Sequence, residues 1–302
     1  MRIAVFGASG RIGQMMRSVP CPDEVKMTWV SRMPPPGSDW RQWSPDEAVD
    51  LDWLHDVDTV LVLAGATPTR GEVFEKAEMM QANVDLSLVL HESAARAGVE
   101  RVLLASSAAV YGRQADPNAL IAETTDCHPE TDYGYSKLAM ERAVAAQVAQ
   151  LGPQSPATTC LRIATVAGAD MLLQNAANAT ETAPLTLDCF ADGRGPERSY
   201  IGPNALAAVL LALCTTPEDL PFLLNIAAPG AVQMDALLNS FGPDGAPIPW
   251  TFRPAPKAAL RRVVLDTARL EALHLAPPRA DAASIAQEAR AILCRVQPEN
   301  EE

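Results

Sequence analysis

The sequence is poor in the features that mark secreted, membrane-spanning and metal-binding proteins. Its six cysteines include no CxxC pair, so we expect buried, reduced thiols instead of a disulfide framework. Its four histidines include no HExxH motif, and we therefore expect no metal site. No apolar run approaches the roughly 18–20 residues that a bilayer span needs, which argues against a membrane-spanning segment.

Positive charge is also scarce. The 24 basic residues are outnumbered by 37 acidic ones, and the formal net charge is −13. Such a chain repels phosphate backbones, so we expect no nucleic acid as a partner, and with no apolar span we expect no membrane. Glycines and Arg11 interrupt the first apolar run where a signal peptide would continue. We therefore expect a cytoplasmic protein that binds a small molecule.

Short apolar runs alternate with helical stretches through the first half of the sequence. This alternation predicts an α/β fold, a doubly wound parallel sheet of the Rossmann type. After Gly168 proline and glycine become frequent, which predicts a dinucleotide-binding domain over 1–168 and a smaller C-terminal substrate lobe over 169–302. Within that lobe, residues 222–241 are expected to return to the main sheet. The apolar runs are 2–7, 27–30, 59–63, 101–106 and 158–166, and the clearest helical stretches are 82–97 and 134–150.

Three glycines follow the first apolar run at intervals of three residues. Gly7, Gly10 and Gly13 open the first helical stretch, where glycine permits a tight turn and a close approach of the backbone to a pyrophosphate. The alternative is an ordinary strand–turn–helix glycine cluster. We interpret the segment as a dinucleotide loop because of its strand–turn–helix setting. The predicted loop residues are Gly7, Ser9, Gly10, Arg11, Ile12 and Gly13.

The end of the second apolar run bears on which dinucleotide binds. An acidic residue there would hold a ribose 2′-hydroxyl, whereas an arginine can pair with a 2′-phosphate. The run 27–30 continues into Ser31 and Arg32 with no acid. This favours NADP(H) over NAD(H), with Arg11 as a second positive group. The alternative is that Arg32 is a solvated turn residue.

A tyrosine and a lysine stand four residues apart at the start of a helical stretch. Tyr133 and Lys137 would share one helix face. A neighbouring ammonium favours the phenolate and lowers the pKa of a tyrosine, which suits it to proton transfer. Ser107 follows the run 101–106, at the strand end where α/β proteins bind ligands. Each signal also has an ordinary reading as a surface pair or a turn-capping serine, but together they indicate a catalytic site.

Taken in order, these motifs resemble the extended short-chain dehydrogenase/reductase family, which includes nucleotide-sugar epimerases, dehydratases and reductases. The motifs are GASGRIG at 7–13, SSAAVYG at 106–112 and YGYSK at 133–137. The resemblance implies that Ser107 binds the reacting carbonyl or hydroxyl, that Tyr133 is the acid/base, and that Lys137 holds the nicotinamide ribose and tunes Tyr133. The further residues that it places along the cofactor are Leu63, Ala64, Gly65 and Asn83.

The family's substrate-binding positions are matched less closely. Sugar dehydratases of the family carry an Asp-Glu pair where this chain has Ala108 and Ala109. Thr165 stands where many epimerases have an asparagine that contacts the substrate. Arg198 matches an arginine that can pair with a substrate phosphate; its alternative is a structural arginine bound to carbonyls or acids. With Ser107, these two residues are the predicted substrate contacts.

The sequence therefore predicts an enzyme that transfers hydride to or from a hydroxyl or carbonyl carbon of a sugar-like substrate, nucleotide sugars included. One alternative is an NADPH-dependent reductase of a small ketone or aldehyde. A second is a non-catalytic regulator that senses NADP, which would not need the serine, tyrosine and lysine. Relatives often dimerise through the two helices matching 82–97 and 134–150, so the resemblance also implies a homodimer.

Overall fold

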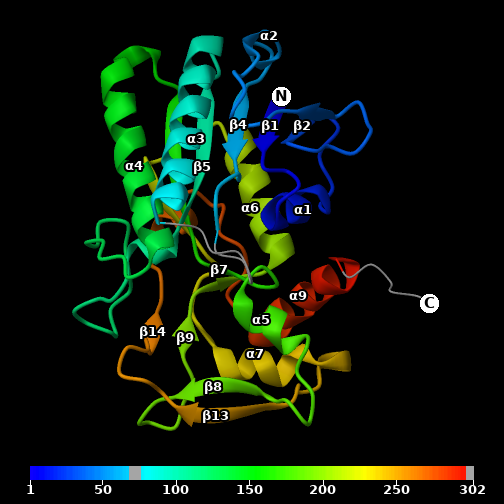
Figure 1. Cartoon of the computed structure of the whole chain (residues 1–302), viewed down its shortest axis with the longest axis vertical. Helices are drawn as coiled ribbons and strands as arrows, with labels where there is room; N and C mark the ends of the chain where they lie inside the picture. The colour runs from blue at the N-terminus through cyan, green and yellow to red at the C-terminus, as the bar shows by residue number, and fades with distance from the viewer. Residues whose placement is uncertain (68–75, 297–302) are drawn as a thin grey trace. The chain divides into compact units, whose positions relative to one another are not determined.

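The computed structural model describes residues 1–67 and 76–296 (Figure 1). The chain forms two compact units, which are interleaved along the sequence. One crossing between them, at Ile163 and Ala164, lies near the change of composition at Gly168. Unit 1 comprises Met1–Gly112, Thr124–Ile163 and Leu210–Leu224, and unit 2 comprises Arg113–Glu123, Ala164–Val209 and Asn225–Glu302.

A seven-stranded sheet of order β11-β6-β5-β4-β1-β2-β3 is the framework of unit 1. The pairs that join β3 through to β6 are all parallel. The chain builds outward from β1 to β3 on one side and from β4 to β6 on the other, so the predicted doubly wound α/β fold is confirmed. The strands are β1 (Arg2–Phe6), β2 (Lys26–Ser31), β3 (Trp40–Gln42), β4 (Thr59–Val62), β5 (Arg101–Ser107), β6 (Ala157–Ile163) and β11 (Leu223–Ile226).

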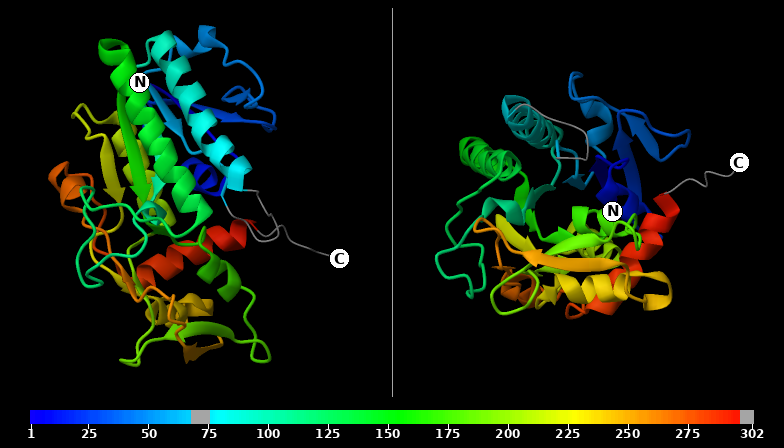
Figure 2. Two further views of the ribbon diagram at one scale, coloured as in Figure 1. Left: turned by 60° about the vertical axis from the view of Figure 1, so that its left-hand side comes forward. Right: turned by 60° about the horizontal axis from the view of Figure 1, so that its bottom comes forward.

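The central strands are apolar throughout because both faces of the sheet are covered. On β1, Ala4 and Phe6 pack in one buried cluster with residues of α2, α3 and α4. The alternate residues Ile3 and Val5 are also fully buried, on the opposite face. Figures 1 and 2 show α3 and α4 side by side along one face of the sheet. The helices of this unit are α1 (Arg11–Arg17), α2 (Leu51–Leu54), α3 (Lys76–Ala97) and α4 (Asp132–Leu151), with short 3-10 turns η1 (Ala108–Val110) and η2 (Gly152–Gln154).

Unit 2 is built from short strands and helices around its own core. Leu187, Tyr200 and Leu237 are among the residues buried in that core. Its strands form three small sheets, β10-β7, β12-β9-β14 and β13-β8. They are β7 (Thr165–Val166), β8 (Leu185–Cys189), β9 (Glu197–Arg198), β10 (Tyr200–Ile201), β12 (Val232–Gln233), β13 (Trp250–Pro254) and β14 (Arg262–Val263). The helices are α5 (Met171–Ala176), α6 (Pro203–Thr215, shared with unit 1), α7 (Met234–Phe241), α8 (Ala268–Ala272) and α9 (Ala282–Val296), with the turn η3 (Pro243–Gly245).

The cysteines correct one expectation. All six are free, but only Cys160 and Cys214 are buried, whereas Cys21 and Cys294 are exposed. The prediction of buried thiols is therefore wrong for most of them, because scattered positions say nothing about burial. Within residues 1–67 and 76–296, no helix combines the length and hydropathy of a bilayer span, and no group of acidic, histidine and cysteine side chains is arranged to hold a metal ion.

A buried histidine joins α3, α4 and β6. His91 has no exposed surface. Its Nδ1 lies 2.8 Å from Gln147 Oε1 and its Nε2 lies 2.9 Å from Thr158 Oγ1. Burial lowers the pKa of His91 below its usual value, because the charged imidazolium is poorly solvated there.

We expect acidification to destabilise the wild-type protein more than a His91→Gln variant. The unfolded chain takes up a proton on this residue near pH 6.5, whereas the folded chain resists it, so the free energy of unfolding falls as the pH drops through that range. Urea unfolding at pH 7.5 and pH 5 measures the difference. His55→Gln, which removes an exposed histidine, is the matched control. An equal pH dependence in the wild type and His91→Gln would contradict the assignment.

Candidate active site

The glycine loop packs closely against the neighbouring strands at the switch point of the sheet, where the strand order reverses between β1 and β4. Gly7 has a φ of +86°, and a Cβ there would lie 2.5 Å from the backbone nitrogen of Ala64. A Cβ on Gly13 would lie 2.6 Å from the Cα of Ala8. The backbone nitrogens of Gly7 and Ala8 donate to the carbonyl of Val30. The loop therefore has room only for glycine at both positions. Its backbone packs against the neighbouring strands with no side chain in between.

The predicted phosphate-binding residues lie at the start of α1. Gly10 is its N-cap and makes no side-chain hydrogen bond to the first turn, and a helix N-terminus is a general site for anions. Arg11 and Ser9 are exposed and Ile12 is partly buried. The structure thus brings together all six loop residues that the sequence predicts.

The end of β2 carries a hydroxyl and a guanidinium beside this loop. Ser31 is 5% exposed, and its Oγ is buried without a hydrogen-bond partner. Arg32 follows it and is exposed. A buried hydroxyl without a partner is unfavourable unless a ligand or water satisfies it. The glycine loop and this hydroxyl are therefore the groups that could hold a dinucleotide, with its pyrophosphate at α1 and a ribose at the end of β2.

The segment after β4 meets α3 and α4. Asn83 is 1% exposed; its Oδ1 accepts from the backbone nitrogen of Ala66, and its Nδ2 donates to Ser136 Oγ at 2.9 Å. The place where Gly65 would carry a Cβ is 2.6 Å from Asn83 Oδ1 and 3.2 Å from Lys137 Nζ. The predicted cofactor residues Leu63, Ala64, Gly65 and Asn83 therefore lie together with Lys137, within unit 1.

Tyr133 and Lys137 lie in the first turns of α4 because Thr131 caps this helix. Thr131 Oγ1 accepts from the backbone nitrogen of Gly134 at 3.1 Å, and α4 begins at Asp132. Lys137 is 4% exposed, donates to the carbonyl of Ala105 at 2.9 Å, and has its Nζ 5.9 Å from the centre of the Tyr133 ring. Burial lowers the pKa of Lys137 to about 8.

Ser107 completes the group at the end of β5. Its side chain is partly exposed, accepts from the backbone nitrogen of Ala109 at 3.2 Å, and hydrogen-bonds to Tyr133. Burial raises the pKa of Tyr133, and the bond to Ser107 lowers it by a smaller amount. The sequence argument expected a pKa lowered by Lys137. The net direction differs because desolvation of the phenolate outweighs its hydrogen bond.

The predicted substrate residues Thr165 and Arg198 lie in unit 2. Thr165 is partly exposed in β7, opposite Tyr200 of β10. Arg198 Nη1 donates to the carbonyls of Glu197 and Arg261, and its Nη2 donates to that of Leu260 at 2.5 Å. Bonds to backbone carbonyls are those of a structural arginine, which was the alternative to a phosphate-binding arginine in the sequence analysis.

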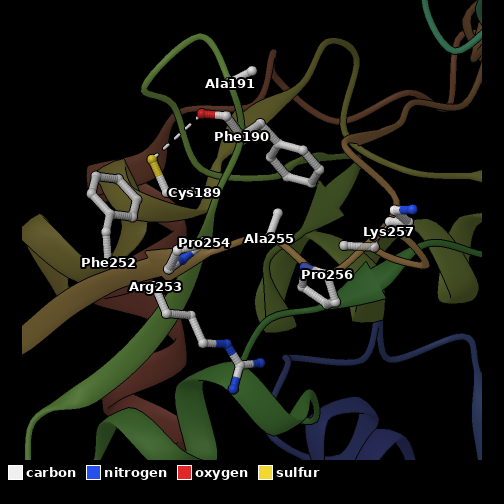
Figure 3. Close-up of a pocket in the computed structure, with 10 residues that line it drawn as sticks. Cys189, Phe190, Ala191, Phe252, Arg253, Pro254, Ala255, Pro256 and Lys257 are labelled. Carbon is white, nitrogen blue, oxygen red and sulfur yellow. Dashed lines mark hydrogen bonds between the residues drawn. The ribbon is translucent and has the colours of Figure 1, made fainter.

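Unit 2 also holds a pocket that the motifs did not reveal. It has a volume of about 700 Å³ and lies where β8 and β13 pair. Figure 3 shows Phe190, Pro256 and Lys257 on one side of it and Phe252 beside Cys189 on the other. Arg253, also in its lining, forms an ion pair with Asp188 at 2.7 Å. Only the β8–β13 pairing brings these residues together, and neither strand was predicted.

The sheet order and the glycine loop at its switch point define a Rossmann-type α/β protein. The model of the NAD dependent epimerase/dehydratase family matches residues 3–205. The chain belongs to this family, as the motifs predicted.

Curated relatives match part of the chain. A UDP-glucose 4-epimerase from Azospirillum brasilense is 35% identical over 116 residues, which are 38% of this chain and 32% of that protein. A uronate dehydrogenase from Pseudomonas syringae pv. tomato is 30% identical over 146 residues, which are 45% of this chain and 50% of that protein. The chain thus spans half or less of the length of these relatives.

Solved structures are similar over almost the whole chain. MoeE5 in complex with UDP-glucuronic acid and NAD has a TM-score of 0.79 at 22% identity, covering 98% of this chain and 100% of that one. A UDP-glucose-4-epimerase from Stenotrophomonas maltophila, with bound NAD and formylated UDP-arabinopyranose, has a TM-score of 0.79 at 18% identity and covers 98% of each chain. At these identities the likeness is one of fold.

We expect Gly7→Ala to destabilise unit 1 and to abolish dinucleotide binding, because the added Cβ would overlap the backbone of Ala64. Gly98→Ala is the matched control, since Gly98 also has a positive φ of +75° but has no atom within 4 Å of the added Cβ. The control should lose about 1–2 kcal/mol of unfolding free energy through backbone strain alone. Urea unfolding and NAD(P)H fluorescence titration measure both effects. Equal losses and retained binding in the two variants would contradict the close approach at Gly7.

Proposed function

We propose that the chain is a nicotinamide-dependent oxidoreductase or epimerase that transfers hydride to or from a hydroxyl or carbonyl carbon of a sugar-like substrate. The observation that carries the proposal is the meeting of Ser107, Tyr133 and Lys137 in unit 1, next to the segment that follows β4. The phenol and the hydroxyl are hydrogen-bonded to each other, and the ammonium lies 5.9 Å from the phenol ring. A non-catalytic sensor has no need for this arrangement.

In the proposed reaction, Tyr133 gives or takes the proton of the reacting oxygen, and Ser107 donates a hydrogen bond that holds the same oxygen. Lys137, whose pKa is about 8, carries a positive charge at neutral pH and favours the phenolate of Tyr133. A bound nicotinamide would supply the hydride donor or acceptor. Because burial raises the pKa of Tyr133, the proton-accepting form depends on positive charge nearby.

The family and the pocket of unit 2 support a proposal for the substrate class. We propose a substrate with an anionic part, because Arg253 and Lys257 line a pocket that also contains Phe190 and Phe252. Basic and aromatic side chains of this kind suit a nucleotide diphosphate. The relatives named for UDP-sugars and uronate support this class. Sugar dehydration is disfavoured, since Ala108 and Ala109 provide neither an acid nor a base.

We propose NADP(H) as the preferred cofactor, on the evidence of Arg32 and Ser31. Neither can repel a 2′-phosphate as a carboxylate would, and the exposed guanidinium of Arg32 can pair with it. The solved structures with similar folds hold NAD, so the cofactor preference is the point at which this chain would depart from them. An NADPH-dependent reductase of a small carbonyl compound is the second candidate function that the same residues favour.

We expect Tyr133→Phe to lower kcat by about 10²–10⁴-fold while the cofactor Kd changes little, because only the proton-transfer group is removed. The substrate is first chosen by thermal shift of NADP-loaded protein against UDP-, GDP- and dTDP-sugars, free uronates and simple ketones. Tyr135→Phe is the matched control, since Tyr135 is 47% exposed on the same helix. Turnover that survives in Tyr133→Phe would remove this residue as the acid/base.

We expect Arg32→Ala to weaken NADPH binding at least tenfold and to leave NADH binding within twofold, since only NADPH carries the 2′-phosphate. Fluorescence titration of both cofactors against the wild type and the variant measures the two ratios. Wild-type protein that binds NADH as tightly as NADPH would show that Arg32 does not select the cofactor.

A further inference from the structure

A cluster of buried charged side chains begins one helical turn after Lys137, the last residue of the candidate active site on α4. Glu141 of α4 accepts a hydrogen bond from Ser106 Oγ of β5 at 2.5 Å. The same carboxylate accepts from Arg162 Nε at 3.0 Å and from Arg162 Nη2 at 2.7 Å. Arg162 lies on β6 at the position paired with Ser106, so the cluster joins three elements of unit 1.

The cluster is sealed from solvent. Glu141, Arg162 and Ser106 are each 3% exposed, and Tyr111 is fully buried. The Arg162 guanidinium lies 4.7 Å from the centre of the Tyr111 ring. A buried ion pair is a weak source of stability, because desolvation of both charges offsets their attraction. The geometry of this cluster is nevertheless narrowly defined, because the guanidinium, the carboxylate and the hydroxyl must satisfy one another's hydrogen bonds where water is excluded.

The cluster and the active site occupy consecutive positions on the same two elements. Tyr133, Lys137 and Glu141 follow one another at intervals of four residues on one face of α4. Their side chains contact three consecutive residues at the end of β5: Tyr133 contacts Ser107, Lys137 contacts the carbonyl of Ala105, and Glu141 contacts Ser106. A shift of α4 along β5 would therefore break all three contacts together.

We propose that Glu141 is a positioning residue, which through Ser106 and Arg162 sets α4 against the end of β5 and so holds Tyr133 and Lys137 in place relative to Ser107. The proposal rests on the proposed function. Glu141 does not touch the reacting atoms; it acts through its hydrogen bonds and its charge. The buried end of this helix face, at Glu141, thereby fixes the position of its other end, at Tyr133.

The charge of Glu141 has a second consequence for the active site. Within the part of the chain that the structure describes, the titratable groups that face Lys137 are Tyr133 and Glu141 on its own helix and Cys160 on β6. The thiol of Cys160 stays protonated because burial raises its pKa. Burial lowers the pKa of Lys137, and Cys160 and, to a smaller extent, the negative charge of Glu141 act in the opposite direction. Glu141 therefore helps Lys137 to stay charged, although Arg162 also faces it and neutralises part of its field.

Three substitutions test separately the length of the Glu141 side chain, its charge and its hydrogen bond to Ser106. Ser106→Ala removes one hydrogen bond and leaves the ion pair intact. Glu141→Asp keeps the charge but shortens the side chain, and Glu141→Gln keeps the length but removes the charge. We expect the first two to lower kcat at least threefold with KM and cofactor Kd within twofold. Ser93→Ala, which alters a buried serine of α3 outside the cluster, is the matched control and should change none of these constants.

The effect of the Glu141 charge on the pKa of Lys137 is tested by a measurement that needs no enzymatic turnover. The chain has only four lysines, so an NMR titration of ¹³Cε-labelled lysine resolves Lys137 from Lys26, Lys76 and Lys257. We expect the Lys137 midpoint near pH 8 in the wild type, at least half a unit lower in Glu141→Gln, and unchanged in Ser106→Ala. This measurement is independent of activity, so it still tests the role of Glu141 if the proposed reaction proves wrong.

Two results would overturn the proposal. One is a kcat for Ser106→Ala and Glu141→Asp that equals the wild-type value, as for Ser93→Ala. The other is a Lys137 midpoint that does not move in Glu141→Gln. Thermal unfolding of each variant identifies any that fails to fold, and Ser106→Ala, the mildest change, then decides the kinetic part.

Discussion

The candidate chemistry of unit 1 depends on one packing contact, the face of α4 against the end of β5. Residues four apart share one face of a helix, so Tyr133, Lys137 and Glu141 all lie on the side of α4 that contacts Ser107, Ala105 and Ser106 of β5. The first, Tyr133, is partly exposed, and the next two, Lys137 and Glu141, are buried. The contact is therefore partly open to water at Tyr133 and closed to water at Lys137 and Glu141.

The second constraint is the close approach of backbone at the switch point of the sheet. Gly7 and Gly13 let the loop between β1 and α1 lie against its neighbours without side chains. The loop thus brings the first turn of α1 to this switch point, and a helix N-terminus favours an anion even though the chain as a whole has a formal charge of −13.

The strands buried on both faces were predictable, and the short exposed ones were not. β1, β2, β4 and β5 lie within two residues of the predicted runs because continuous burial requires continuous apolar sequence. The run 158–166 divides at Ala164 into β6 and β7. The edge strands β3 and β13 were missed, since they are mostly exposed and carry polar residues or proline. Without β13, the pocket of unit 2 had no signal in the sequence.

The sequence by itself determined the glycine loop, the Tyr133–Lys137 spacing and the strand-end Ser107, because each depends on residues close together along the chain. Only the tertiary structure decided the direction of the Tyr133 pKa, the carbonyl partners of Arg198 and the pairing of Glu141 with Arg162. Burial and long-range pairing set these properties. They depend on which residues become neighbours when the sheet closes, and spacing along the chain does not contain that information.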